Sequence, residues 1–119
     1  MGLEAYQNRI RVRVCGVLIE DSHILLAQLR SPLTDELIWI PPGGGVHFGE
    51  SREDALKREF FEETGLKIKV AELLFNNEII HPPYHAVEFY YLVERRGGHL
   101  QAGKDPEHSS EAQILRDVQ

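Results

Sequence analysis

The sequence predicts an α/β (α+β) fold in which one long helix packs against a sheet. Residues 9–14 and 66–70 alternate apolar and polar side chains, a period typical of strands. Between them, Leu56 and Phe60 lie one helical turn apart and form an apolar stripe that can dock on a core. Predicted strands outnumber helices, and 119 residues are enough for one domain with a modest core, so we expect residues 1–119 to form a single domain.

The predicted helix has signals at both of its ends. Ser51 is a suitable N-cap, and Asp54, three residues later, is an imperfect partner for a capping box. Gly65 tolerates the left-handed conformation that often follows a helix, so it supplies the stop. We therefore expect the helix to run between these two residues.

Three glutamates share one face of this helix. At about 100° per residue, Glu62 lies about 60° to one side of Glu59 and Glu63 about 40° to the other. Like charges at this spacing repel each other, and Arg58 neutralises only part of the charge. A divalent cation that prefers oxygen ligands, Mg²⁺ or Mn²⁺, would offset far more. For three glutamates alone, a solvated acidic face is the commoner explanation.

The rest of the chain is predicted as strands joined by turns and polar loops. We expect a strand at residues 9–19, a turn at 20–22 and a return strand at 23–30 that completes a hairpin. Further strands are expected at residues 37–40, 66–75, 78–80, 86–94 and 111–118. Their connections are a bulge or turn at 76–77, a loop at 81–85, a turn at 95–98 and a polar loop at 103–110.

Composition excludes some classes of function. Thirteen basic and nineteen acidic residues give a net charge of −6, which argues against a general nucleic-acid-binding protein. The chain has one cysteine, Cys15, in an apolar stretch, so no internal disulfide can form. We find no signal peptide and no long apolar run, and we expect a protein of the reducing cytoplasm with no membrane partner.

Residues 44–66, GGVHFGESREDALKREFFEETGL, resemble the Nudix box, G-x5-E-x7-R-E-U-x-E-E-x-G-U, in which U is a bulky apolar residue. The matching positions are Gly44, Glu50, Arg58, Glu59, Glu62, Glu63, Gly65 and Leu66. Phe60 stands at a U position that usually holds Ile, Leu or Val. Upstream, residues 39–43 look like the W-x-x-P-G entry of the family, with a second proline as a variant. The resemblance favours a metal site over a solvated acidic face.

The resemblance implies an α/β/α sandwich with a mixed sheet, in which the box forms a loop–helix–loop. Relatives usually continue from the last strand into a final helix, which here is apparently short or missing. If one face of the sheet is left bare, a homodimer could cover it.

The resemblance also implies an activity, namely metal-dependent hydrolysis of a nucleoside diphosphate linked to another moiety. One to three Mg²⁺ ions would be held by Glu59, Glu62, Glu63 and the carbonyl of Gly43. The general base is either a box glutamate or a downstream loop carboxylate, with Glu111 preferred over Glu107. In the box, Arg58 would orient Glu59 or another carboxylate through a bidentate bond. Supporting roles are expected for Gly44, Glu50 and Gly65.

Substrate contacts are less clearly marked. Arg11 and Arg13 belong to an alternating arginine row, which is either a solvated sheet face or a contact for an anionic substrate. Among relatives, a proline after the box points to ADP-ribose and a tyrosine to diadenosine polyphosphates. Pro82 and Tyr84 therefore give conflicting hints, although the tyrosine could stack on a base. A (deoxy)nucleoside triphosphate is a third possibility.

Two other classes of function stay open. One is a catalytically silent, Nudix-like binding or regulatory domain, although the complete set of charged box residues argues against it. The other is an RNA 5′-pyrophosphohydrolase, which would need a basic track for RNA that a net charge of −6 does not favour.

Overall fold

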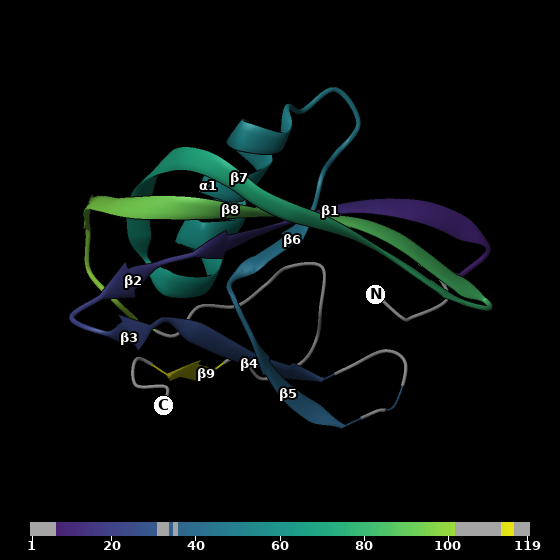
Figure 1. The fold of residues 1–119 in the computed structure, drawn as a ribbon, viewed down its shortest axis with the longest axis horizontal. Coiled ribbons are helices and arrows are strands. Elements are labelled where there is room, and N and C mark those ends of the chain that lie inside the picture. Colours follow the sequence, from purple (N-terminus) through teal and green to yellow (C-terminus); the bar gives the residue numbers. More distant parts are fainter. Residues whose placement is uncertain (1–6, 31–33, 35, 102–112, 116–119) are drawn as a thin grey trace.

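The computed structural model describes residues 7–30, 34, 36–101 and 113–115, which form one helix and nine strands (Figure 1). The elements are β1 Arg9–Val17, β2 Ile19–Glu20, β3 His23–Ile24, β4 Leu26–Arg30, β5 Leu37–Ile40, β6 Gly43–Gly45, α1 Arg52–Thr64, β7 Leu66–His81, β8 Tyr84–Gly98 and β9 Gln113–Leu115.

The main sheet has four strands in the order β6-β1-β8-β7. It is mixed, because β1 is parallel to β8 but antiparallel to β6, and β7 is antiparallel to β8. A second sheet, β5-β4-β9, lies below the main sheet in the view of Figure 1, and α1 lies behind the main sheet. The predicted fold class, with a mixed sheet and a mid-chain helix, is confirmed. The described residues include only one of the two helical layers that a sandwich would have.

The core lies between α1 and the main sheet. Phe60 is fully buried, and a Cβ on Gly16 of β1 would lie 2.9 Å from its ring. A bulky residue at position 60 is therefore matched by the absence of a side chain at position 16. The buried apolar residues of this cluster are Val14, Leu18, Leu25, Ala55, Leu56, Phe60, Leu66, Ile68 and Val93.

The predicted first hairpin is divided into shorter strands. The long first strand ends at Val17, and β2 and β3 then pair as a separate two-stranded sheet. Asp21 and Ser22 form the turn with φ of 51° and 64°. Two positive φ values match the twist of a tight hairpin, and Asp accepts this conformation more readily than most residues.

The prediction of a turn at residues 95–98 is wrong. This segment is the last part of β8 and pairs with the first residues of β7. Gly98 has a φ of 84°, and a Cβ there would lie 2.2 Å from the carbonyl oxygen of Gly65. The glycine thus allows two backbones to approach closely where α1 ends, and it does not reverse the chain.

The β7–β8 ribbon is longer and more regular at its tip than predicted. Asn76 and Asn77 pair normally with β8, and the register shifts occur earlier, between Lys67 and Ile68, Val70 and Glu72, and Leu73 and Phe75. The loop predicted at 81–85 is reduced to a turn at Pro82-Pro83.

The predicted final strand at 111–118 is seen as β9, which pairs with β4. The remaining residues of that strand, the loop at 103–110 and the prediction about a final helix lie outside the described residues. In the part of the chain that the structure describes, the helix is neither long nor apolar enough to cross a membrane.

Candidate active site

The two ends of α1 are fixed by the residues expected to fix them. The Ser51 hydroxyl accepts a hydrogen bond from the backbone N–H of Asp54 at 3.0 Å. Gly65 has a φ of 77°, and its N–H donates to the carbonyl of Phe61 at 2.8 Å. The N-cap and the glycine stop are therefore as predicted, and the helix face that meets the core is the one that carries Leu56 and Phe60.

Two of the three glutamates are buried against the glycine strand β6. Glu59 is 0% exposed and Glu63 is 3% exposed. The N–H of Gly43 donates to Glu63 Oε2 at 3.0 Å. A Cβ on Gly44 would lie 2.4 Å from the carboxyl carbon of Glu59, so only glycine leaves room for that carboxylate. Because an ionised carboxylate is costly to bury, such a pair indicates a site with compensating charge.

Arg58 contacts three glutamates and the glycine strand of the site. Its guanidinium makes a bidentate pair with Glu50, with Nε–Oε2 at 2.8 Å and Nη2–Oε1 at 3.0 Å. Nη2 also donates to the carbonyl of Gly45 at 3.0 Å. Nη1 lies between two helix carboxylates, 3.2 Å from Glu59 Oε2 and 3.3 Å from Glu62 Oε1. The guanidinium of Arg58 thus bonds to β6, to the loop before the helix and to α1.

Glu50 holds the loop that precedes the helix. Besides the pair with Arg58, it accepts a hydrogen bond from the backbone N–H of His47 at 3.0 Å. The Arg58 guanidinium lowers the pKa of Glu50 to about 2, against a burial effect that would raise it. Glu50 is therefore ionised throughout the neutral range and serves as an anchor for Arg58.

The chemistry of the donor set fits a hard divalent cation. Three carboxylates, of Glu50, Glu59 and Glu62, contact one guanidinium, and that of Glu63 bonds to the neighbouring β6, so negative charge is in excess. Carboxylate oxygens are the ligands that Mg²⁺ and Mn²⁺ prefer. As they stand, however, no three acidic, histidine or cysteine side chains among the described residues converge closely enough to hold a metal ion. In this arrangement Arg58 bonds to both Glu59 and Glu62, while Glu63 accepts a hydrogen bond from Gly43.

The residues predicted to contact substrate lie elsewhere. Arg11 and Arg13 are on β1, on the sheet face turned away from α1. Arg13 is mostly buried and forms an ion pair with Glu88 of β8. Tyr84 begins β8 and is four residues from Glu88, about 13 Å along the strand. The structure therefore does not bring Tyr84, the register partner of Arg9, close to the Arg13–Glu88 ion pair.

Glu88 was not singled out from the sequence, yet it is only 4% exposed. Its one signal was an acidic residue inside an otherwise apolar and aromatic strand. The two downstream candidates for the general base, Glu111 and Glu107, lie outside the described residues.

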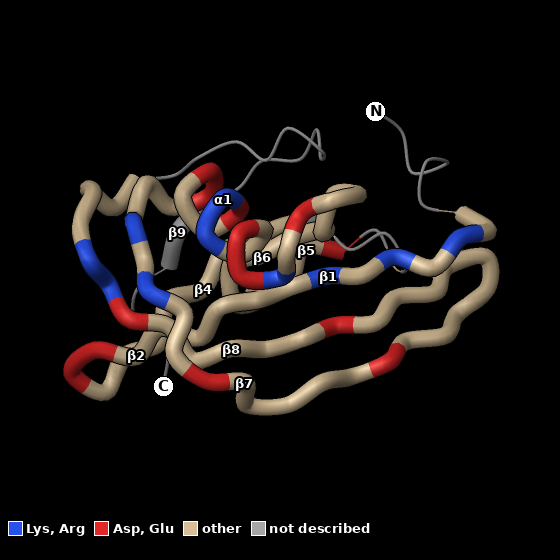
Figure 2. The backbone as a smooth tube through the Cα atoms, turned by 90° about the horizontal axis from the view of Figure 1, so that it is seen from above, with Lys and Arg blue, Asp and Glu red and all other residues tan. Residues whose placement is uncertain are grey.

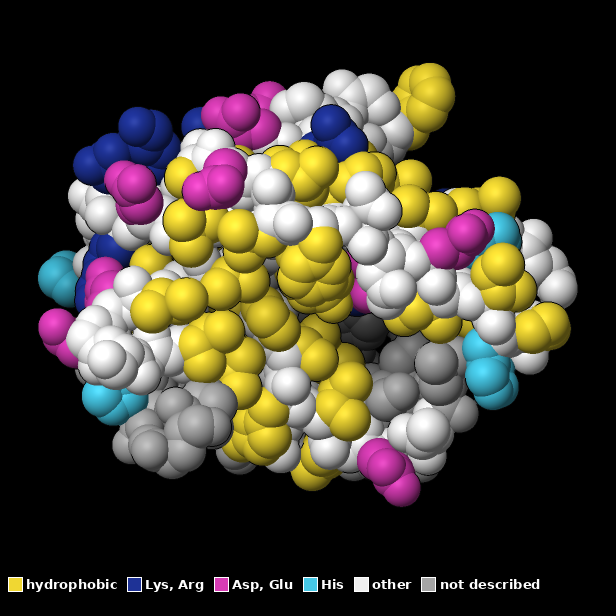
Figure 3. Space-filling model, in the orientation of Figure 1, with side chains coloured by type: hydrophobic (Ala, Val, Ile, Leu, Met, Phe, Trp, Pro, Cys, Tyr) yellow, Lys and Arg dark blue, Asp and Glu magenta, His cyan; other side chains and the backbone are white. Residues whose placement is uncertain are grey.

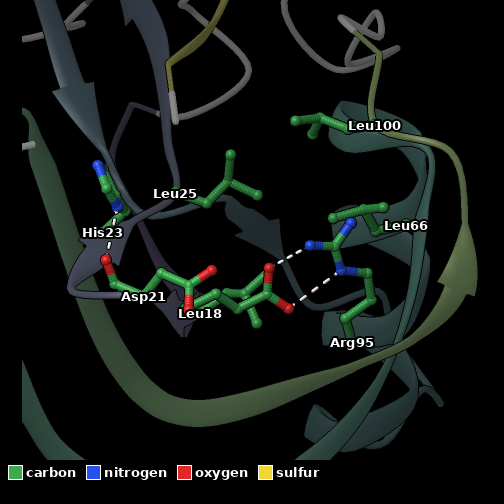
Figure 4. Close-up of a pocket in the computed structure, with 8 residues that line it drawn as sticks. Leu18, Asp21, His23, Leu25, Leu66, Arg95 and Leu100 are labelled. Atoms are coloured by element: carbon green, nitrogen blue, oxygen red, sulfur yellow. Dashed lines mark hydrogen bonds and ion pairs between the residues drawn. The ribbon is translucent and has the colours of Figure 1, made fainter. Parts of the chain in front are cut away.

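A separate pocket of about 330 Å³ lies beside the β2–β3 turn (Figure 4). Its apolar lining is formed by Leu18, Leu25, Leu66 and Leu100, and Arg95 pairs with Glu20 at its border. None of the glutamates of α1 lines it. We therefore place the candidate site at the charged surface between α1 and β6, where Figure 2 shows acidic and basic residues gathered along the helix.

Comparison with known proteins agrees with this geometry. A model of the NUDIX domain matches residues 8–115. The ADP-ribose pyrophosphatase of Methanocaldococcus jannaschii is 35% identical over 96 residues, which cover 79% of this chain and 56% of that protein. The diphosphoinositol polyphosphate phosphohydrolase 3-beta of Bos taurus is 40% identical over 74 residues, covering 62% and 43%. The chain thus spans about half the length of these relatives.

A similar fold has been solved. The crystal structure of the MutT NUDIX hydrolase from Burkholderia pseudomallei matches with a TM-score of 0.77 and 28% identity, covering 92% of this chain and 83% of that one. Together with the glycine strand, the capped helix and its buried glutamates, these matches show that the chain belongs to the NUDIX family.

Proposed function

We propose that this protein is a divalent-metal-dependent hydrolase that cleaves the pyrophosphate linkage of a nucleoside diphosphate joined to another moiety. The observation that carries the proposal is the burial of Glu59 and Glu63 against Gly43 and Gly44, with Glu62 at the rim of the same site. Buried like charges are unfavourable for stability alone, so their retention points to a function that uses them.

Glu59, Glu62, Glu63 and the carbonyl of Gly43 would hold Mg²⁺ or Mn²⁺. The bound cation would lower the pKa of a water molecule and neutralise charge on the phosphoryl group. The chain's own residues do the rest. Arg58 keeps its bidentate hold on Glu50 and so fixes the loop, while its Nη1 orients Glu59 and Glu62.

Glu62 is the box glutamate best placed to take a proton from the attacking water. Its side chain is 28% exposed, whereas the Glu59 side chain is completely buried. A base must reach water and release the proton to solvent, which favours the more exposed carboxylate. Glu111 is the alternative base from the downstream segment.

ADP-ribose, a dinucleoside polyphosphate and a (deoxy)nucleoside triphosphate are the substrate classes we propose to compare. A relative of this chain is named an ADP-ribose pyrophosphatase, which supports the first of them. Arg11 and Arg13 lie on the sheet face turned away from α1, so they would contact only an anionic part of the substrate that extends over that face. Tyr84 would contact only a group that extends along the ribbon.

We further propose a reducing, cytoplasmic setting. Burial raises the pKa of the single thiol, Cys15, to about 11, so the residue acts as a small core side chain and forms no disulfide. A homodimer remains part of this proposal, to be tested by light scattering.

The test is a hydrolysis panel in the presence of Mg²⁺ or Mn²⁺. It contains ADP-ribose, diadenosine tetraphosphate, dGTP and a short 5′-triphosphorylated RNA, with products separated by chromatography. We expect turnover of at least one small nucleotide and complete loss of turnover with a chelator. Binding of a nucleotide without any turnover would favour the silent domain. Turnover of the RNA alone, with strong salt dependence, would favour the RNA pyrophosphohydrolase.

A further inference from the structure

The last turn of α1 carries Glu63, one of the carboxylates proposed to hold the cation. Its neighbour Thr64, the last residue of the helix, has no part in the chemistry described so far. Helix ends tend to fray, because their last carbonyls lack partners within the helix. A carboxylate in such a turn needs other contacts to keep it in one position, and here those contacts come from two directions.

The Thr64 hydroxyl makes the first set of contacts. It donates a hydrogen bond to the carbonyl oxygen of Phe60 at 2.6 Å and accepts one from the backbone N–H of Leu66 at 3.1 Å. Phe60 lies one turn back in the helix, and Leu66 is the first residue of β7. The hydroxyl thus joins the last helical turn to the following strand, across the stop at Gly65.

This hydroxyl lies in the interior of the protein. Thr64 is 0% exposed, and Leu66 is 1% exposed. Figure 3 shows hydrophobic side chains over the centre of the surface that lies in front of α1 in this view. Removing the hydroxyl would therefore take an acceptor from a buried N–H that solvent water does not reach, which is unfavourable for the present geometry of the turn.

The segment that follows β8 makes the second set of contacts. The N–H of Gln101 donates to the carbonyl oxygen of Thr64 at 2.8 Å, and the N–H of His99 donates to that of Gly65 at 3.2 Å. In Figure 1 this segment descends from the end of β8 toward the lower end of α1. The end of the helix is thereby attached to β8 as well as to β7.

The position of Glu63 depends on this turn. Glu63 directly precedes Thr64, is 3% exposed and accepts a hydrogen bond from the N–H of Gly43 at 3.0 Å. Neighbouring residues of a helix are about 100° apart around its axis, so the two side chains point in different directions from one rigid turn. A movement of that turn would displace the Glu63 carboxylate relative to β6.

We propose that Thr64 is a positioning residue whose hydroxyl fixes the last turn of α1, so that the Glu63 carboxylate stays at Gly43 in the geometry that binds the cation. Thr64 acts through Glu63 and contacts neither cation nor substrate. The inference rests on the proposed function for the role of the cation, whereas the Glu63–Gly43 contact can be tested in the metal-free protein.

The test compares Thr64→Val, which replaces the hydroxyl with a methyl group of similar size, with Thr64→Ser, which keeps the hydroxyl. NMR of the metal-free protein would measure the amide signal of Gly43, and electron paramagnetic resonance would measure binding of Mn²⁺. We expect Thr64→Val to move the Gly43 amide proton upfield, as its bond to Glu63 weakens, and to reduce Mn²⁺ affinity about 10-fold. Thr64→Ser should match the wild type in both measurements.

Ile68→Val is the control for a loss of stability alone. Ile68 is a core residue of β7, 7% exposed, and the substitution removes one carbon from the core. It should lower the melting temperature while the Gly43 signal and the Mn²⁺ affinity stay unchanged. If Thr64→Val does not fold, Thr64→Ala and Thr64→Ser, which differ only in the hydroxyl, provide the same comparison.

The proposal is overturned if Thr64→Val keeps either the wild-type Gly43 signal or the wild-type Mn²⁺ affinity, because the hydroxyl would then serve stability only. It is also overturned if Thr64→Ser or Ile68→Val shows the same losses as Thr64→Val. Turnover in the substrate panel that does not depend on the Thr64 hydroxyl would remove this role and keep the hydrolase. Hydroxyl-dependent Mn²⁺ binding in a protein that turns over none of the substrates would remove the hydrolase and keep this role.

Discussion

The two faces of the main sheet are built in different ways. On the α1 face, charged side chains that are close in sequence converge on one guanidinium, and buried carboxylates lie against glycines. On the opposite face, residues far apart in sequence meet only through strand register, as Arg13 and Glu88 do. Figure 2 shows charged residues gathered along α1 and sparse along the middle of β7 and β8. A local motif thus supplies the proposed chemistry, whereas the contacts of the opposite face depend on the topology of the sheet.

The largest effect is expected from Glu62→Gln, which keeps the shape of the side chain and removes its charge. Turnover should fall by about 100-fold or more while the protein folds normally, because a proton acceptor and a metal ligand are lost together. Steady-state kinetics at saturating Mg²⁺ measures this effect. Glu53→Gln is the control, because Glu53 is an exposed residue of the same helix that pairs with Lys57. Near-wild-type turnover of Glu62→Gln would remove the role assigned to this residue.

Gly44→Ala tests whether the buried carboxylate needs the glycine. A new Cβ would lie 2.4 Å from the carboxyl carbon of Glu59, so Glu59 must move, at a cost of about 1–3 kcal/mol in stability. Turnover should fall as well. Gly97→Ala is the matched control, since a Cβ at Gly97 meets nothing within 4 Å. Thermal unfolding of the two variants gives the comparison. Equal melting temperatures would contradict the claim that the Glu59 carboxylate needs a glycine at position 44.

Glu50→Gln tests the contribution of the Glu50–Arg58 ion pair to stability, measured as a function of pH. The folded-state pKa of Glu50 is about 2, below its ordinary value of 4.5, so its charge stabilises the fold above about pH 4.5. That contribution disappears as the pH falls from 4.5 to 2. The variant should therefore be about 1–3 kcal/mol less stable than wild type at neutral pH. The gap should close in acid, as measured by urea unfolding across this range. A gap that is constant with pH would show that the ion pair is not its source.

The smallest effect is expected from Arg95→Ala. Arg95 also makes a bidentate pair, with Glu20, but the two side chains are 35% and 40% exposed. Exposed pairs contribute about 0–1 kcal/mol, and this one lies away from the glutamates of α1, so stability should change little and turnover not at all. Denaturant unfolding and the substrate assay provide the check. A loss of stability comparable to that of Glu50→Gln would mean that the Arg95–Glu20 pair, at the border of the pocket beside the β2–β3 turn, has a role of its own.

Much of the helix face could be predicted from the sequence because its determinants are local. The cap at Ser51, the stop at Gly65 and the shared face of the glutamates depend on residues within a few turns of one another. The partner of Arg58 was less predictable, since its bidentate bond goes to Glu50 in the loop. That choice depends on how the loop folds back over the helix.

The opposite face could not be predicted in the same way. The Arg13–Glu88 pair joins residues 75 positions apart, and no local pattern specifies their register. The turn expected at residues 95–98 failed for a related reason. The two glycines, Gly97 and Gly98, are typical of a turn, but Gly98 instead permits a close backbone approach to Gly65, which exists only in the folded chain.

The bulges of β7 have a consequence for solubility. β7 is the outer strand of the main sheet, and such a strand can recruit another chain through its open backbone groups. The register shifts near Val70 and Leu73 interrupt the regular ladder that an added strand would need, and Lys67 and Lys69 place charge at its start. The first half of β7, which carries these shifts, is thereby a poor template for edge-to-edge pairing with another chain.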